Sequence, residues 1–155
     1  EWLRVLNVNL LIAADCAREL VCLLETAAKR RGGMSTITFI SSICGVEALE
    51  CPVAYASAKA ALQMYSKNIS RELAPRGIRV NCVTPGNILF SGSNWDAKLR
   101  CDRTAVEKML EQEVPLRRFG KPEEIASVVV FLASERAGFA TGANWIVDGG
   151  QTRSW

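Results

Sequence analysis

Three short runs rich in β-branched and apolar residues are the feature that most constrains the fold. They are STITFIS (Ser35–Ser41), IRVNCVTPG (Ile78–Gly86) and ANWIVDGG (Ala143–Gly150). Longer segments with the apolar spacing of helices separate these runs, so the chain alternates between helices and strands. This alternation predicts an α/β fold in which helices cover both faces of a parallel sheet whose strands are buried on both sides.

Four helical segments are expected around these strands. The first covers Glu1–Arg31, which contains no Pro or Gly. The second begins at Pro52 and ends near Pro75, and a weaker amphipathic helix covers Asp96–Glu113. The last begins at Pro122, which two Glu residues follow in the first turn. The order predicts the carboxyl-terminal part of a doubly wound sheet, with an exposed apolar edge on its first strand.

Composition limits the classes of function. The 155 residues suit one domain, and 49% hydrophobic with 23% charged residues is an ordinary globular balance. A net charge of +3 is too small to indicate a nucleic-acid partner. The basic cluster Lys29–Arg31 precedes Gly32 and is expected to end a helix rather than to bind phosphate. Because the sequence has no apolar run that could span a bilayer and no leader, we expect a cytoplasmic protein with no membrane partner.

The chain contains six Cys and no His. None of the Cys residues has CxxC spacing, which argues against a zinc site, and the lack of His excludes His-based catalytic triads. The Cys residues lie mostly in apolar stretches, so we expect free, buried thiols in a reducing compartment.

Tyr55 and Lys59 lie four positions apart near the start of the second helix. Residues at this spacing share one helical face, so the ammonium group would lower the Tyr pKa from about 10 and suit it to general acid/base work. The alternative is a chance spacing within a tight helix–helix contact, since small residues surround the pair. Ser42 follows the first strand, where ligands of parallel sheets gather, and its hydroxyl could share a proton with Tyr55. Ser41 fits the pattern equally well.

Two further features have alternative explanations. Asn9 lies inside the first helix, where Asn is unfavourable, and either faces solvent, holds a water or opens the backbone; Asn7 is an equal candidate. Pro85-Gly86 ends the second strand, and either lets backbone approach a flat ring or makes a simple turn.

Taken in chain order, six motifs resemble the carboxyl-terminal half of the short-chain dehydrogenase/reductase family. They are NVNL, ITFISSICG, YASAK, IRVNCVTPG, RRFGKPEEIASVVVFLAS and TGANWIVDGG, of which YASAK matches the family's Tyr-x-x-x-Lys motif. The chain is most similar to 3-oxoacyl-acyl-carrier-protein reductases and related sugar or alcohol dehydrogenases. The resemblance covers nearly the whole chain and implies a single partial domain over residues 1–155 with a Rossmann-like doubly wound sheet.

The resemblance also implies an oxidoreductase that uses NAD or NADP to interconvert a hydroxyl and a carbonyl group. In this family pattern Tyr55 is the general acid/base, and Lys59 lowers its pKa and binds the nicotinamide ribose. Ser42 orients the substrate oxygen, and Asn9 holds the water of a proton relay.

Other roles follow from the same resemblance. Pro85, Gly86 and Ile88 would line the nicotinamide. Residues 87–113 would form a substrate loop and lid, with Phe90 and Trp95 as wall residues around a small alcohol or ketone. The first helix and the Tyr55 helix would pair with their copies in a homodimer or homotetramer.

The chain departs from the family pattern in two respects. It has no counterpart of the Gly-rich phosphate loop, the adenosine pocket and the first strands, so the sequence does not distinguish NAD from NADP. Where many members carry a Thr shortly after Pro-Gly to bind the carboxamide, this chain has Phe90 and then Ser91. The alternative function is therefore a truncated, catalytically inactive homologue that serves as an oligomerisation or interaction module.

Overall fold

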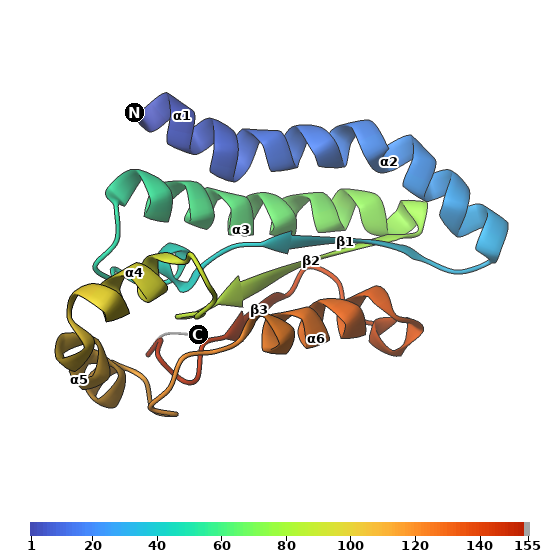
Figure 1. The fold of residues 1–155 in the computed structure, drawn as a ribbon. Helices are drawn as coiled ribbons and strands as arrows, with labels where there is room; N and C mark the ends of the chain where they lie inside the picture. The colour runs from blue at the N-terminus through green and yellow to red at the C-terminus, as the bar shows by residue number, and fades with distance from the viewer. Residues whose placement is uncertain (154–155) are drawn as a thin grey trace.

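Residues 1–153, the part of the chain that this computed structural model describes, form a parallel sheet between two layers of helices (Figure 1). The strands lie in the order β1 (Ser35–Ile40), β2 (Ile78–Pro85) and β3 (Asn144–Val147). Both pairings of the central strand β2 are parallel. The predicted parallel sheet is confirmed, and β1 forms one of its edges.

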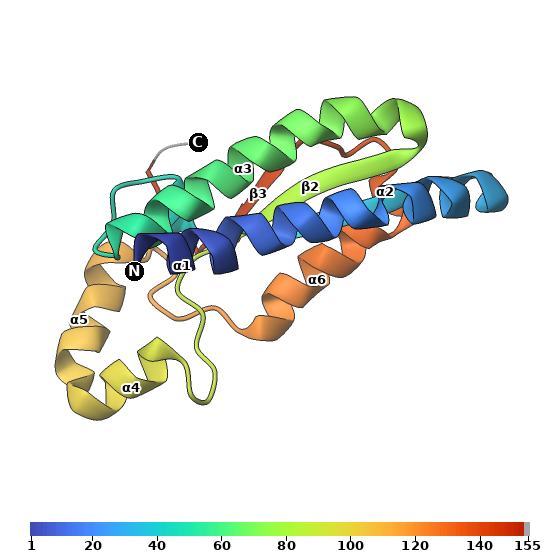
Figure 2. The same ribbon diagram turned by 90° about the horizontal axis from the view of Figure 1, so that it is seen from above.

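One face of the sheet is covered by the amino-terminal helix and by α3 (Val53–Leu73), which run side by side (Figures 1 and 2). The amino-terminal helix consists of α1 (Trp2–Leu6), the π-helical segment η1 (Asn7–Leu11) and α2 (Ile12–Arg31). As predicted, it ends at Gly32, which adopts the left-handed conformation. No helix within residues 1–153 is both long and apolar enough to cross a membrane.

The opposite face is covered by α6 (Pro122–Ala133), which contacts β1 and β2 (Figure 1). Its amino terminus is capped by the Glu124 carboxylate, which accepts a hydrogen bond of 2.8 Å from the Lys121 backbone N–H. Leu132 of α6 packs with Val83 of β2 in a buried cluster. Helices therefore cover both faces of the sheet, as the alternating sequence pattern predicts.

The single helix expected over Asp96–Glu113 is wrong: two helices occupy this stretch. They are α4 (Asn94–Cys101) and α5 (Arg103–Glu113), with Asp102 between them. Asp102 has an extended φ of −149°, and its carboxylate accepts a hydrogen bond of 3.0 Å from the Ala105 backbone N–H. An Asp side chain that caps a helix in this way competes with helix continuation, which explains the break.

Short 3-10 turns complete the fold. These are η2 (Ile43–Gly45), η3 (Ala74–Arg76) and η4 (Glu135–Ala137).

The cysteines differ in part from the prediction. All six are free, as expected, but only Cys82 on β2 is buried. Cys16 and Cys22 on α2 and Cys101 on α4 are exposed.

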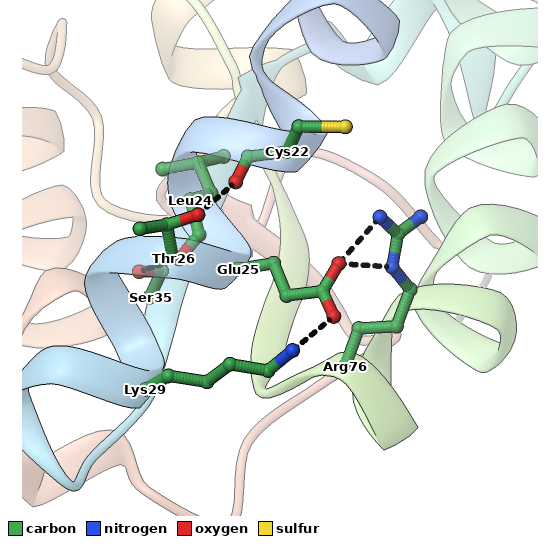
Figure 3. A network of polar contacts seen from close by, with 7 residues as sticks. All are labelled: Cys22, Leu24, Glu25, Thr26, Lys29, Ser35 and Arg76. Carbon is green, nitrogen blue, oxygen red and sulfur yellow. Dashed lines mark hydrogen bonds and ion pairs between the residues drawn. The ribbon is translucent and has the colours of Figure 1, made fainter.

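A small polar cluster ties the end of α2 to the turn η3 (Figure 3). The Glu25 carboxylate accepts hydrogen bonds from Lys29 Nζ at 2.8 Å and from Arg76 Nη2 and Nε at 2.6 and 2.9 Å. These two cations lower the pKa of Glu25, with the Lys29 contact the larger cause. Since the Glu25 side chain is only 24% exposed, this cluster holds the helix end against η3 more firmly than a fully exposed ion pair would.

This cluster predicts a pH-dependent contribution to stability. A carboxylate whose folded-state pKa is depressed stabilises the fold above its ordinary pKa, and this contribution is lost as the pH falls through the folded-state value. Denaturant unfolding should therefore show Glu25→Gln less stable than wild type at pH 7, with the difference shrinking at pH 3. Glu19→Gln is the matched control, because Glu19 is exposed and pairs with the exposed Arg18. A loss of unfolding free energy in Glu25→Gln that is the same at pH 7 and pH 3 would contradict the prediction.

Candidate active site

The candidate site begins where β1 ends. Ser41 continues the sheet, since its backbone N–H donates to the Val83 carbonyl at 2.8 Å. Ser42 is extended and caps η2: its Oγ accepts a hydrogen bond of 3.2 Å from the Cys44 N–H. The turn η2 therefore starts at the carboxyl edge of the sheet, where parallel folds bind their ligands.

Gly45 lets this turn lie directly on α3. A Cβ at position 45 would come within 2.6 Å of the Ala60 backbone N and 2.7 Å of the Lys59 carbonyl carbon. Such distances are too short for any side chain, so Gly is required for η2 to contact the α3 backbone at this point. The contact brings Ser42 close to the first turns of the helix.

The structure brings Ser42, Tyr55 and Lys59 together. Tyr55 and Lys59 lie on one face of α3, with Lys59 Nζ 5.7 Å from the centre of the Tyr55 ring. Lys59 Nζ donates to the Ile40 carbonyl at 3.0 Å, and the Ser42 side chain lies close enough to the Tyr55 phenol to lower its pKa. Ser42 therefore lies near the Tyr–Lys face, and the roles of these three side chains stay predictions.

The electrostatics differ from the expectation that Lys59 would lower the Tyr55 pKa. Burial raises the pKa of Tyr55, and the hydrogen bond from Ser42 opposes that rise only in part. Burial also lowers the pKa of the Lys59 ammonium. In this chain, the free-energy cost of burying the Tyr55 phenolate therefore exceeds the stabilisation that its favourable contacts give.

Two thiols that the sequence did not single out adjoin Tyr55. Cys44 and Cys51 are both partly buried, and their negative forms would raise the Tyr55 pKa further. Burial and a hydrogen bond with Cys44 raise the pKa of Cys51 to about 11, so its thiol is protonated near neutral pH.

Gln63 is another residue that the sequence analysis missed. Its amide Nε2 donates to Ser41 Oγ at 3.0 Å and to the Ser42 carbonyl at 3.1 Å. Its position four residues after Lys59 was the available signal, because that spacing keeps it on the same helical face.

Asn9 opens the helix backbone, one of the alternatives raised for it. It lies within η1, where the Ile12 N–H bonds to the Asn7 carbonyl five residues earlier. The Asn9 side chain donates to the Val5 carbonyl at 3.0 Å, and η1 packs against α3. Interruptions of this kind are frequent at functional sites, but this hydrogen bond keeps the Asn9 amide within its own helix.

Pro85 and Gly86 lie at the carboxyl end of β2, on the same edge of the sheet as Ser42. The Gly86 N–H donates to the Val147 carbonyl at 3.0 Å, and a Cβ on Gly86 would come within 2.7 Å of the Asp148 Cα. The glycine therefore accommodates the chain after β3. Ile88 forms an isolated bridge with Gly120 and lines a small cavity beneath this edge.

Phe90 lies in the segment between β2 and α4, and Trp95 lies in the first turn of α4. Phe90 is exposed and lines a shallow groove together with Leu99 and Arg103. Trp95 packs against Phe119 with ring centres 5.3 Å apart, and Lys98 Nζ lies 4.4 Å above its ring. Among residues 1–153, no group of three or more His, Cys, Asp or Glu side chains is arranged to hold a metal ion.

Comparison with known proteins agrees with this architecture. The family model described as enoyl-(acyl carrier protein) reductase matches residues 1–152. Dehydrogenase/reductase SDR family member 4 of Rattus norvegicus is 36% identical over 151 residues, which are 96% of this chain and 50% of that protein. The 3-oxoacyl-[acyl-carrier-protein] reductase FabG of Aquifex aeolicus is 36% identical over 154 residues, which are 97% of this chain and 56% of that protein.

Solved structures show the same similarity. L-sorbose reductase from Gluconobacter frateurii, in a complex with NADPH and L-sorbose, superposes with a TM-score of 0.88 at 33% identity, covering 99% of this chain and 59% of that one. 4-Hydroxyisoleucine dehydrogenase in a complex with NADH superposes with a TM-score of 0.81 at 28% identity, covering 99% and 60%. The chain thus spans about half the length of its curated relatives. On this evidence, it belongs to the short-chain dehydrogenase/reductase family.

Proposed function

We propose that this chain carries the proton-transfer part of an NAD- or NADP-dependent oxidoreductase that interconverts a hydroxyl and a carbonyl group on a small molecule. The observation that supports this most is the convergence of Ser42, Tyr55 and Lys59 at the carboxyl edge of the sheet. Relatives that are named reductases or dehydrogenases give the reaction class.

The three side chains have complementary tasks in this proposal. In the reducing direction, the Tyr55 hydroxyl donates its proton to the substrate oxygen as negative charge develops there. The Ser42 hydroxyl hydrogen-bonds both this oxygen and the phenol, which fixes the direction of proton transfer. When bound, the nicotinamide supplies or accepts the hydride. Asn9 is proposed to hold a water that returns the proton to Tyr55, through the opened backbone of η1.

The donors present fit a nicotinamide ribose. An ammonium group has three donors, and the Lys59 contact with the Ile40 carbonyl uses one of them, which leaves others for ribose hydroxyls. We propose that Pro85, Gly86 and Ile88 form the wall behind the nicotinamide ring. Structural relatives bind NADPH in one case and NADH in another, so the proposal includes both cofactors.

Residues 87–113 are proposed as the substrate loop and lid of a single domain over residues 1–155. They leave the sheet at the edge that carries Ser42 and include α4 and α5 (Figure 2). Phe90 and Trp95 are proposed as wall residues for the alcohol or ketone. A cytoplasmic location stays a prediction.

The proposed proton transfer is tested by Tyr55→Phe in an active preparation that contains this chain. Turnover, followed by reduced-nicotinamide absorbance with NADH and with NADPH over a panel of ketones, should fall by about 10²-fold or more, the usual contribution of a general acid. Tyr65→Phe is the matched control, because Tyr65 lies in the core away from the site and contacts Ala14.

Near-normal turnover by Tyr55→Phe, with both variants folded by circular dichroism, would refute the acid/base role. Absence of turnover by the wild-type protein with either cofactor would favour the second candidate function, a non-catalytic association module. An exposed apolar surface on the amino-terminal helix supports that second candidate.

We propose that the protein forms a homodimer or homotetramer through the amino-terminal helix and α3. Exposed apolar side chains lie along that helix, including Leu3, Val8 and Leu23, which is 65% exposed. We propose that the partner subunit covers part of these apolar side chains.

Analytical ultracentrifugation should therefore find an oligomer in the wild type and a smaller species for Leu23→Glu. Val130→Glu is the matched control, since Val130 is 68% exposed but lies on α6, on the other side of the sheet. A stable wild-type monomer at micromolar concentration would rule the proposal out. If Val130→Glu dissociated the oligomer and Leu23→Glu did not, the interface would lie on α6 instead.

A further inference from the structure

A glutamine about three turns into α3 connects the helix to the end of β1. The Gln63 amide donates one hydrogen bond to the Ser41 hydroxyl and another to the Ser42 carbonyl, at 3.0 and 3.1 Å. An amide has two N–H donors, so one side chain can hold both consecutive serines. Gln63 lies eight residues after Tyr55, on the helical face that carries the proposed catalytic groups.

The Ser41 hydroxyl extends this connection to Lys59. Ser41 is 5% exposed, and its Oγ donates to the Lys59 carbonyl at 3.0 Å while it accepts the bond from Gln63. A Cβ on Gly45 would come within 3.0 Å of Gln63 Nε2, so the amide also fills the space beside the turn η2. The end of β1 is thus fastened to α3 by polar contacts that run from Gln63 through Ser41 to the Lys59 carbonyl.

We propose that Gln63 is a positioning residue that holds Ser42 beside the Tyr55 phenol. The inference rests on the proposed function for its importance to catalysis, but its structural claim can be measured without turnover. Without the amide, the Ser42 carbonyl loses a donor, and the turn that begins at Ser42 is free to shift along α3.

The groups that face the Tyr55 phenol determine how loss of the Gln63 amide should change the pKa of Tyr55. The Ser42 side chain lowers the pKa of the phenol, whereas Cys44 and Cys51 raise it from the loop that precedes α3. Lys59 lies 5.7 Å from the ring on the same helix and keeps its own contact with Ile40. A displaced Ser42 should therefore leave the phenol harder to ionise.

The chain offers a direct test because it contains only two Tyr residues, Tyr55 and Tyr65. In a Tyr65→Phe background, the ¹³Cζ resonance of labelled tyrosine reports Tyr55 alone. Gln63→Met keeps the side-chain length but removes the amide, and it should move the Tyr55 titration to higher pH, as should Ser42→Ala. Gln112→Met, on the exposed face of α5, is the matched control and should leave the titration unchanged.

A double variant separates positioning from a direct effect. If Gln63 acts through Ser42, Gln63→Met adds no further shift when Ser42→Ala is already present. A shift of equal size in both backgrounds would overturn the proposal, as would an unchanged titration in Gln63→Met. Circular dichroism on the same samples confirms that the chain is folded at each pH.

A second measurement avoids high pH. The Cys44 N–H is bonded to Ser42 Oγ at 3.2 Å, so its hydrogen exchange near pH 7 reports the position of the serine. We expect this amide to exchange roughly tenfold faster in Gln63→Met, with the β2 amides unaffected. Unchanged protection of Cys44 would overturn the proposal. Failure of the proposed function appears instead in turnover, which Tyr55→Phe would retain or the wild-type protein would lack.

Discussion

Pairing of the central strand β2 with a neighbour on each side sets the positions of the other elements. From Ile78 to Thr84 every residue of β2 is buried, including the polar side chains of Arg79 and Asn81. Burying an uncompensated cation is costly, and Arg79, only 3% exposed, donates to the carbonyls of Leu132, Ser134 and Ala140. Through these bonds β2 holds the carboxyl end of α6 and the chain that leads into β3.

The geometry of the candidate site depends on this strand. Because Ser41 still pairs with Val83, the last sheet contact lies one residue before Ser42. The turn η2 then packs on α3 at Gly45, and Gln63 fastens it there. Ser42 and Tyr55, thirteen positions apart in the chain, meet because a sheet edge and a helix are joined by contacts that do not involve either hydroxyl. Preorganisation of this kind lets the proposed proton transfer proceed without rearrangement of the site.

The sequence predicted the features that depend on residue spacing. The apolar runs located all three strands, Pro52 and Pro122 marked helix starts, and the four-residue spacing placed Tyr55 and Lys59 on one face. The break at Asp102 could not be read in advance, because capping and helix continuation compete there with similar energies. The pKa of Tyr55 and the bonds of Gln63 depend on burial and on contacts across the fold, which spacing does not encode. The roles assigned to Asn9, Phe90 and Trp95 stay predictions.

The central claim is that this chain by itself brings the Ser42 hydroxyl to the Tyr55 phenol. Nuclear Overhauser spectroscopy of the wild-type chain at neutral pH tests it directly, with Tyr65→Phe used to assign the Tyr55 ring protons. The account predicts a cross-peak between the Ser42 β-protons and the Tyr55 ring. Absence of this cross-peak in a chain whose β1–β2 pairing is intact would contradict it.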